Sequence, residues 1–136
     1  MKVKLRKGAY MPERAHETDA GYDLRSPVSI DIPARSHVNI NTGVSLQIPR
    51  EYCGFIKSRS GLNSKFGLTS EGVIDSGYRG EIVVTLRNNT NEPYTVKRGD
   101  KISQIVFLPI FTEVMEAVDV LDESDRGEAG FGSTGK

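Results

Sequence analysis

The apolar segments of this 136-residue chain are short, rich in β-branched residues and repeatedly broken by proline or glycine, as at Pro33, Pro49, Gly99 and Pro109. Such runs are typical of β-strands, whereas a helix would need apolar residues at helical spacing over about three turns. The strands predicted by this pattern are Val28–Ile32, Val38–Asn41, Val44–Ile48, Tyr52–Lys57, Gly72–Ile74, Glu81–Asn88, Tyr94–Val96, Ile102–Leu108 and Val114–Val118.

One brief helix is expected, Leu62–Phe66, which Gly67 would end. The chain is therefore predicted to be all-β, a sandwich or barrel of short strands. Its length suits a single domain. Only 7% of the residues are aromatic and tryptophan is absent, a modest supply for a small β core, so additional burial between subunits is plausible.

The charges are balanced, with eighteen Lys plus Arg against eighteen Asp plus Glu. No global field would attract nucleic acid or an acidic membrane surface, so an anion site must be built locally. A single cysteine, Cys53, excludes an internal disulfide framework. No run approaches the roughly 20 apolar residues of a membrane span, and the start of the chain does not resemble a signal peptide. We expect a cytoplasmic protein, or one in a host's intracellular compartment if its source is viral, with no nucleic-acid or membrane partner.

The end of the chain is unlike the rest. From Glu113 to Asp125 there are six acids and no base, and DRGEAGFGSTGK follows from Asp125. Its glycines let backbone N–H groups approach a ligand, Arg126 suits phosphate oxygens and Phe131 suits the face of a flat ring. The alternative is an ordinary flexible terminus. We expect a β domain over 1–124 and a glycine-rich arm over 125–136.

Polar groups that interrupt apolar strands are costly unless they serve a purpose. Asp23, between Tyr22 and Leu24, is suited to Mg²⁺ through water or to a turn. In Ser58–Leu62, Arg59 and Ser60 are suited to phosphate, although a serine at a helix start is more often a cap.

Asp75 directly follows the apolar pair Val73 and Ile74 and precedes a Ser76-Gly77 turn. We expect a hairpin here that admits a planar base, with Tyr78 packed on a sugar and Asp75 orienting a water. The alternative is an aspartate that only satisfies the turn. Gln104 lies on one strand face with two aliphatic side chains and needs a partner, either a phosphate or a backbone group.

Five segments, AGYDL, SRSGL, GVIDSGYRGEI, GDKISQIVF and RGEAGFGSTG, occur in this order. Together they closely resemble the five motifs of the homotrimeric deoxyuridine triphosphatases (dUTPases), and the resemblance covers nearly the whole chain. It implies a jelly-roll-like β-clip fold, a homotrimer with active sites between subunits, and a C-terminal tail exchanged between them.

The resemblance also implies residue roles. Asp75 would activate the attacking water and contact the sugar 3′-hydroxyl, Tyr78 would lie beneath the deoxyribose, and the backbone of Gly72, Val73 and Ile74 would read uracil. Asp23 would bind Mg²⁺ through water. The triphosphate would be held by Arg59, Ser60, Gly61 and Gln104. In the tail, Arg126 would contact the γ-phosphate, Phe131 would stack on uracil, and Gly132 and Ser133 would add phosphate contacts.

The implied reaction is Mg²⁺-dependent hydrolysis of dUTP to dUMP and pyrophosphate by in-line attack at the α-phosphorus, which keeps uracil out of DNA and supplies dUMP for thymidylate synthesis. A related dCTP deaminase, alone or bifunctional, is one alternative, but it needs a glutamate where this chain has Thr85. A non-catalytic nucleotide-sensing regulator on the same fold is the other.

Overall fold

The computed structural model describes residues 1–130. Within this range short strands dominate and a single helix interrupts them. The elements in chain order are β1 (Lys2–Leu5), β2 (Gly21–Arg25), β3 (Ile30–Ile32), β4 (His37–Asn41), β5 (Val44–Gln47), β6 (Tyr52–Lys57), α1 (Ser60–Phe66), β7 (Leu68–Thr69), β8 (Glu71–Ile74), β9 (Val83–Asn88), β10 (Tyr94–Val96) and β11 (Lys101–Pro109).

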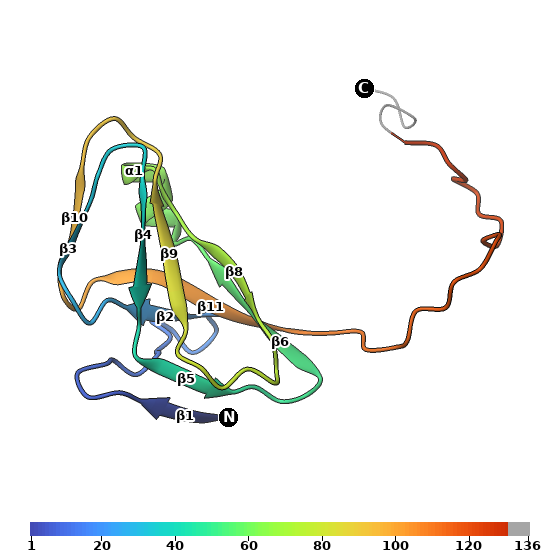
Figure 1. Cartoon of the computed structure of the whole chain (residues 1–136), viewed down its shortest axis with the longest axis horizontal. Helices are drawn as coiled ribbons and strands as arrows, with labels where there is room; N and C mark the ends of the chain where they lie inside the picture. Colours follow the sequence, from blue (N-terminus) through green and yellow to red (C-terminus); the bar gives the residue numbers. More distant parts are fainter. Residues whose placement is uncertain (131–136) are drawn as a thin grey trace.

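The strands form small antiparallel sheets rather than one large one (Figure 1). The largest has the order β2-β11-β6-β8, and a second has the order β4-β9-β7. Two pairs, β1 with β5 and β10 with β3, complete the body. Neighbouring strands in these sheets are not consecutive in the sequence, so each sheet is built from distant parts of the chain. The long strand β11 is central because it pairs with β2 on one side and with β6 on the other.

The core follows the two-residue period of the strands. In β9, Val84 and Leu86 are buried, while Val83 before them and Arg87 after them are exposed. Aliphatic side chains from nearly every sheet meet in one cluster, which includes Leu24, Ile56 and Ile105. This continuous interior fixes how the sheets lie against each other and so places the polar residues at their edges.

The helix α1 is short and depends on its surroundings. It buries no side chain and has no side-chain cap at its start. Gly67 ends it in the left-handed conformation, at φ 60°, which glycine adopts without steric cost. An isolated helix of this length is unstable in water, so its position comes from its surroundings, including the packing of Leu62 on the core and the contact of Phe66 with Tyr94.

After β11 the chain leaves the body. Ile110 still donates its N–H to the carbonyl of Glu51 at 2.9 Å, but residues 111–130 are exposed throughout. Figure 1 shows this arm, in orange and red, running away from the sheets. Several of its exposed side chains are apolar, and Met115 is 98% exposed.

The all-β class predicted from the sequence is confirmed, with the single helix starting two residues earlier than expected. The predicted strand Val114–Val118 is wrong: its β-branched residues have no neighbouring strand in the described part of this chain. The expected hairpin is also wrong as a paired ladder, because β8 pairs with β6 while β9 pairs with β4 and β7. Strands β1, β2 and β7 were not predicted. Among residues 1–130 there is no helix long and apolar enough to cross a membrane.

The burial pattern of β9 gives a direct test of the core. Replacing buried Leu86 by alanine should lower the free energy of unfolding by about 2–5 kcal/mol, because a cavity remains where the side chain was. Val83→Ala, on the exposed face of the same strand, should change it by only about 0.5 kcal/mol. Urea denaturation at one fixed protein concentration measures both values, and equal losses would contradict this assignment of the two faces.

Candidate functional site

Three of the segments singled out in the sequence lie side by side in the largest sheet. Gln104 of β11 is paired in register with Asp23 of β2 on one side and with Lys57 of β6 on the other. The chain that leaves β6 after Lys57 continues into Ser58, Arg59 and the start of α1. The pairings of β11 therefore bring the first, second and fourth segments to one place.

Asp23 holds this place together electrostatically. Its side chain is largely buried, and its two carboxylate oxygens accept separate ion pairs, from Arg59 Nε at 2.9 Å and from Lys101 Nζ at 2.6 Å. Its backbone N–H donates to the carbonyl of Glu13 at 2.8 Å. A charge this buried is costly unless it is paired, so the two cations explain why the chain tolerates it.

A cavity of about 340 Å³ opens beside this cluster. Its lining carries the cationic side chains of Arg25, Arg59 and Lys101 and one carboxylate, Asp100. Burial raises the pKa of the Tyr94 phenol on the same wall, and the charge of Asp100 raises it further. The wall is thus cationic overall, which suits an anionic ligand.

The side-chain amide of Gln104 is hydrogen-bonded within the protein. Its Nε2 donates to the carbonyl of Ser58 at 3.1 Å, so the backbone partner left open by the sequence is present. The other end of the amide lies against Gly21, where a Cβ would collide with Oε1 and would approach Cδ to 2.9 Å. A side chain at position 21 would therefore displace the amide of Gln104 from its present position.

The start of α1 is open to solvent. Ser60 and Gly61 are exposed or partly exposed, and nothing lies within 4 Å of the position that a Cβ on Gly61 would occupy. Backbone N–H groups in the first turn of a helix have no partner inside the helix. Together with the guanidinium of Arg59, they present hydrogen-bond donors to a ligand.

The second candidate region is the turn that follows β8. Asp75 is exposed, and its carbonyl accepts a hydrogen bond from the N–H of Tyr78 at 3.1 Å, which closes the turn. The hydroxyl of Tyr78 donates to the carbonyl of Glu81 at 3.0 Å. The ring covers Gly80 so closely that a Cβ there would lie 2.9 Å from Tyr78 Cε2. Glycine at position 80 thus lets the ring lie flat along the turn.

The strand before this turn offers its backbone. β8 is the edge strand of its sheet, and one of its sides pairs with β6 while the other pairs with no strand among the described residues. Edge strands present free N–H and C=O groups. Gly72 and Val73 are both exposed, Val73 by 57%. This edge matches the expectation that Gly72, Val73 and Ile74 read a base through their backbone, although that role remains a prediction.

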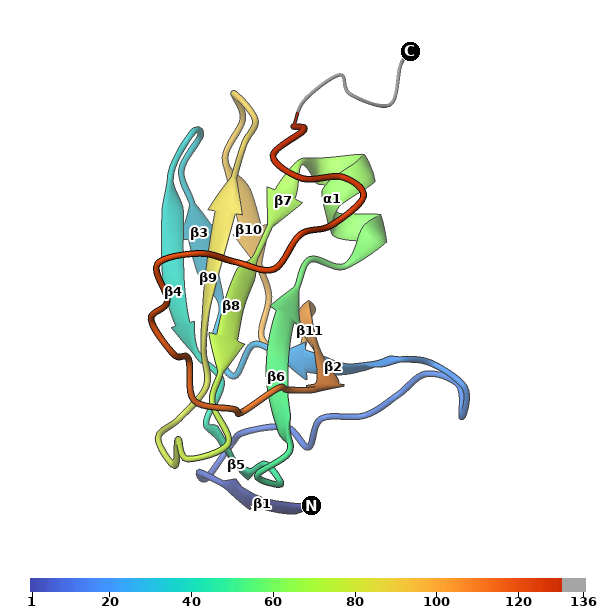
Figure 2. The same ribbon diagram turned by 90° about the vertical axis from the view of Figure 1, so that its right-hand side faces the viewer.

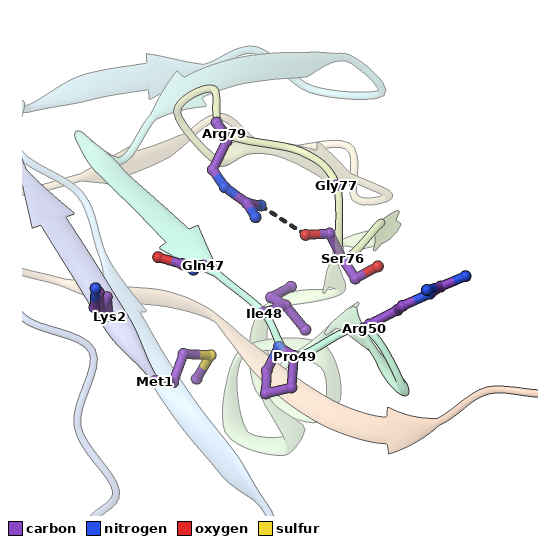
Figure 3. A pocket seen from close by; sticks show the side chains of 9 residues that line it. All are labelled: Met1, Lys2, Gln47, Ile48, Pro49, Arg50, Ser76, Gly77 and Arg79. Atoms are coloured by element: carbon purple, nitrogen blue, oxygen red, sulfur yellow. Dashed lines mark hydrogen bonds between the residues drawn. The ribbon is translucent and has the colours of Figure 1, made fainter.

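A cavity of about 530 Å³ lies on the other side of the same turn (Figure 3). Ser76, Gly77 and Arg79 line it from the turn, and Arg79 donates to the carbonyl of Ser76 at 2.6 Å. Across from them, Figure 3 shows Met1 and Lys2 of the N-terminal segment, with Ile48 and Pro49 between. The turn is therefore held by hydrogen bonds within itself, and Asp75 is exposed on it.

These two regions lie at opposite ends of one ladder. Gly54 of β6 pairs with Ile74, so the next residue, Asp75, lies level with Cys53 near the start of β6. Arg59 lies beyond the other end of β6, six residues after Cys53. Six residues of extended chain span roughly 20 Å. Figure 2 shows the same separation, with α1 at the upper end of β6 and β8 and the turn after β8 at the lower end. Within one chain, Asp75 and Arg59 therefore do not meet.

The remaining candidates are in the arm. Arg126 is exposed, and its Nε donates to the carbonyl of Ala129 at 2.8 Å. The predicted contacts of Phe131, Gly132 and Ser133 lie outside the described residues. Sequence reasoning missed Lys101 as the second partner of Asp23, because their proximity depends on the long-range pairing of β11 with β2 and on the register shift beside Lys101.

Within residues 1–130 no group of three or more His, Cys, Asp or Glu side chains gathers as metal ligands. Asp23, the predicted magnesium residue, already has both oxygens paired with cations. That arrangement does not fit a further cation. At the position where a deaminase would need a glutamate, the hydroxyl of Thr85 donates to Asn39 Oδ1 at 2.8 Å.

The chain is similar to known proteins over nearly its whole length. The dUTPase family model matches residues 7–135. Among curated proteins, the chain is 43% identical to the deoxyuridine 5′-triphosphate nucleotidohydrolase of Tropheryma whipplei strain Twist, covering 97% of this chain and 93% of that protein. It is 44% identical to the protein of the same name from Clostridium tetani, covering 100% and 97%.

Solved structures are also similar. The dUTPase of Staphylococcus bacteriophage 80alpha with dUpNHpp gives a TM-score of 0.92 at 34% identity, covering 99% of this chain and 98% of that one. A mutant dUTPase of phage phi11 of S. aureus gives 0.82 at 33% identity, covering 88% and 96%, and that structure is described as showing the coordination of a structural Mg(II) ion.

The ion pairs of Asp23 predict a loss of stability when the acid is neutralised. Asp23→Asn leaves Arg59 and Lys101 facing each other without a counter-charge. Because both cations are about a third exposed, we expect a loss of about 2 kcal/mol, less than for a fully buried pair. Asp19→Asn, at an exposed turn, should cost only about 0.5 kcal/mol. Equal urea midpoints for Asp23→Asn and the unaltered protein would refute the importance of this cluster.

Proposed function

Since this chain belongs to the dUTPase family and is thus a dUTP diphosphatase, we propose that it hydrolyses dUTP to dUMP and pyrophosphate through a water activated by Asp75. The observation that carries the proposal is the gathering of Asp23, Arg59 and Gln104 around one row of the sheet, while Asp75 is exposed in the turn after β8. Removal of dUTP keeps uracil out of DNA, and the dUMP formed is available for thymidylate synthesis.

The chemistry is a direct displacement. The carboxylate of Asp75 takes a proton from a water, whose oxygen attacks the α-phosphorus in line. A bond forms between this oxygen and phosphorus, and the bond from the α-phosphorus to the bridging oxygen breaks. Pyrophosphate leaves with the electron pair. No covalent intermediate is required, and the rate comes from positioning and from donors placed around the charge on the phosphates.

The substrate is placed by groups on either side of Asp75. The free edge of β8 at Gly72, Val73 and Ile74 pairs with the edge of uracil, and the ring of Tyr78 supports the deoxyribose. Asp75 contacts the 3′-hydroxyl, which ties recognition of the sugar to the reaction. Arg59, Ser60 and Gly61 hold the phosphates, and Gln104 supports them from β11.

The separation of these groups implies that the active site is shared. In one dUTP the α-phosphorus and its neighbouring phosphates are only a few ångströms apart, whereas Asp75 and Arg59 of one chain lie at opposite ends of the β6–β8 ladder. One nucleotide must then contact Asp75 of one copy and Arg59 of another. We therefore propose that the sites lie between subunits, in the homotrimer that the resemblance to the dUTPases implies.

The surface of a single chain supports such an assembly. The arm exposes several large apolar side chains, namely Phe111, Val114, Met115, Val120 and Leu121. Contiguous apolar surface of this kind marks an interaction site. In the proposed trimer the arm crosses to a neighbour, and its last residues, including Arg126, Phe131, Gly132 and Ser133, close over the nucleotide.

Magnesium enters this proposal as a companion of the substrate. A triphosphate binds Mg²⁺ through its own oxygens, and the ion keeps several waters. When bound, the ion neutralises part of the phosphate charge. No step is assigned to Asp23 as a magnesium ligand, because both of its oxygens are held by Arg59 and Lys101.

A panel of nucleotides tests the proposed reaction. With Mg²⁺ present, dUTP should yield pyrophosphate, whereas dTTP, dCTP and UTP should be hydrolysed at least about a hundredfold more slowly, because each mismatches a hydrogen-bonding or steric contact of the site. Pyrophosphate, free phosphate and ammonia are measured together. Release of ammonia from dCTP would favour a deaminase instead, and similar hydrolysis of all four nucleotides would rule out the assigned pocket.

The role of Asp75 has its own test. Asp75→Asn keeps the shape of the side chain but cannot accept the proton, so kcat should fall by about 10²- to 10⁴-fold while binding of dUpNHpp is retained. Asp31→Asn is the matched control, because Asp31 is an exposed aspartate bonded only to Thr95. Steady-state kinetics and calorimetry give the two readouts, and an unchanged kcat for Asp75→Asn would remove it from the mechanism.

A further inference from the structure

Three serines that no predicted role includes surround the segment before α1. Ser58 immediately precedes Arg59, whereas Ser70 lies between β7 and β8 and Ser103 lies in β11. Ser70 is 2% exposed and Ser103 is 0% exposed, so neither can touch a nucleotide. We call Ser58, Ser70 and Ser103 the hydroxyl network.

The donor and the acceptor can be assigned in each hydrogen bond of this network. Ser103 donates its only hydroxyl hydrogen to the carbonyl of Lys57 at 2.9 Å. The oxygens of Ser70 and Ser103 are 2.7 Å apart, so Ser70 must be the donor in that bond. Ser58 donates to the carbonyl of Ser70 at 3.2 Å and accepts from its N–H at 2.9 Å. Every hydroxyl hydrogen in the network is thus used.

These bonds fix the last residues before Arg59, Ser60 and Gly61, which we call the phosphate-binding segment because they are proposed to hold the phosphates. The carbonyl of Lys57 is held by Ser103, and the carbonyl of Ser58 is held by Gln104 Nε2 at 3.1 Å. Both donors come from β11. The side chain of Ser58 is held from a third direction by the backbone of Ser70.

The helix that follows supplies little of this order at its start, because its packing contacts, Leu62 on the core and Phe66 on Tyr94, lie further along it. It has no side-chain cap and buries no side chain. The ion pair to Asp23 holds the guanidinium of Arg59 through Nε and leaves its Nη atoms for a phosphate, but it does not fix the backbone. The backbone position of Arg59 and Ser60 then depends on the bonds to Lys57 and Ser58.

We propose that the hydroxyl network is a positioning device for the phosphate-binding segment, which keeps Arg59 and Ser60 in place for the terminal phosphates of the substrate. The inference rests on the proposed function and deepens it. Ser70 and Ser103 act through the backbone and do not contact the nucleotide. Removing a hydroxyl should therefore weaken the grip on the terminal phosphates without affecting Asp75, which lies at the other end of the ladder.

Full-length Ser103→Ala and Ser70→Ala test this. Each should raise KM for dUTP and Kd for dUpNHpp by roughly three- to tenfold, about the contribution of one hydrogen bond to binding, while kcat stays within about twofold. Ser103→Ala removes two bonds of the network and Ser70→Ala removes one. Inhibition by dUMP, which lacks the terminal phosphates, should be unchanged. The double variant should resemble either single one, because both serines belong to one chain of bonds.

Ser26→Ala is the matched control. Ser26 is also 0% exposed, and its hydroxyl donates to the carbonyl of Val28 at 2.7 Å, away from the segment before α1. This variant should lose stability as the others do but keep its KM. If a variant at Ser70 or Ser103 does not fold, Ser58→Ala decides, because Ser58 is only partly buried and its hydroxyl makes the third hold on the same segment, the two hydrogen bonds to the backbone of Ser70.

These experiments distinguish a failure of the proposed function from a failure of the positioning role of the hydroxyl network. Failure of the unaltered protein to bind dUpNHpp or hydrolyse dUTP would overturn the proposed function. If the unaltered protein is active, the positioning role is refuted by unchanged KM and Kd in folded variants. It is equally refuted by a similar rise in Ser26→Ala, or by a rise in the inhibition constant for dUMP that matches the rise in KM.

Discussion

The central place of β11 in its sheet is the constraint on which the other features of the molecule depend. This strand pairs with β2 and β6 at once, so Asp23, Gln104 and Lys57 fall in one row although they are distant in the sequence. From this row Lys101 and Arg59 reach the carboxylate of Asp23, and Gln104 reaches the carbonyl of Ser58. Loss of either pairing would scatter the groups that are proposed to hold the phosphates.

The same sheet also keeps the two halves of the chemistry apart. Its edge strand β8 carries the free backbone groups and leads to Asp75, while the other end of β6 leads to Arg59 and Ser60. A single chain is therefore an incomplete catalyst on this account. The exposed apolar arm provides a physical reason for copies to associate, and association completes each site.

Much of the fold could be predicted from the sequence, because apolar β-branched runs and the turn formers between them mark the buried strands. The sequence did not predict β1, because it has only two apolar residues, Val3 and Leu5, and these alternate with lysines. It did not predict β2, because that strand is rich in polar residues. Both are strands because of their partners, β5 and β11. The segment 114–118 has the composition of a strand, but no strand lies beside it in the described part of the chain.

The candidate site likewise contains residues that local sequence could suggest and residues that it could not. Asp75, Tyr78 and the segment proposed to bind phosphate could be proposed from local sequence, since each is a polar group set beside a strand or turn. Lys101 and the buried serines could not, because their roles depend on register across β11 and on bonds between segments 33 to 46 residues apart. The exact neighbours of a side chain across a sheet are not encoded in its local pattern.

Mixed oligomers test the shared site most directly. Asp75→Asn and Arg59→Ala subunits, each nearly inactive alone, are unfolded and refolded together, and oligomers containing both are isolated by two affinity tags. If Asp75 of one copy works with Arg59 of another, the mixed oligomers should regain dUTP hydrolysis well above either parent. Verified mixed oligomers that remain as inactive as their parents would show that each site is formed within one chain, and would contradict the account.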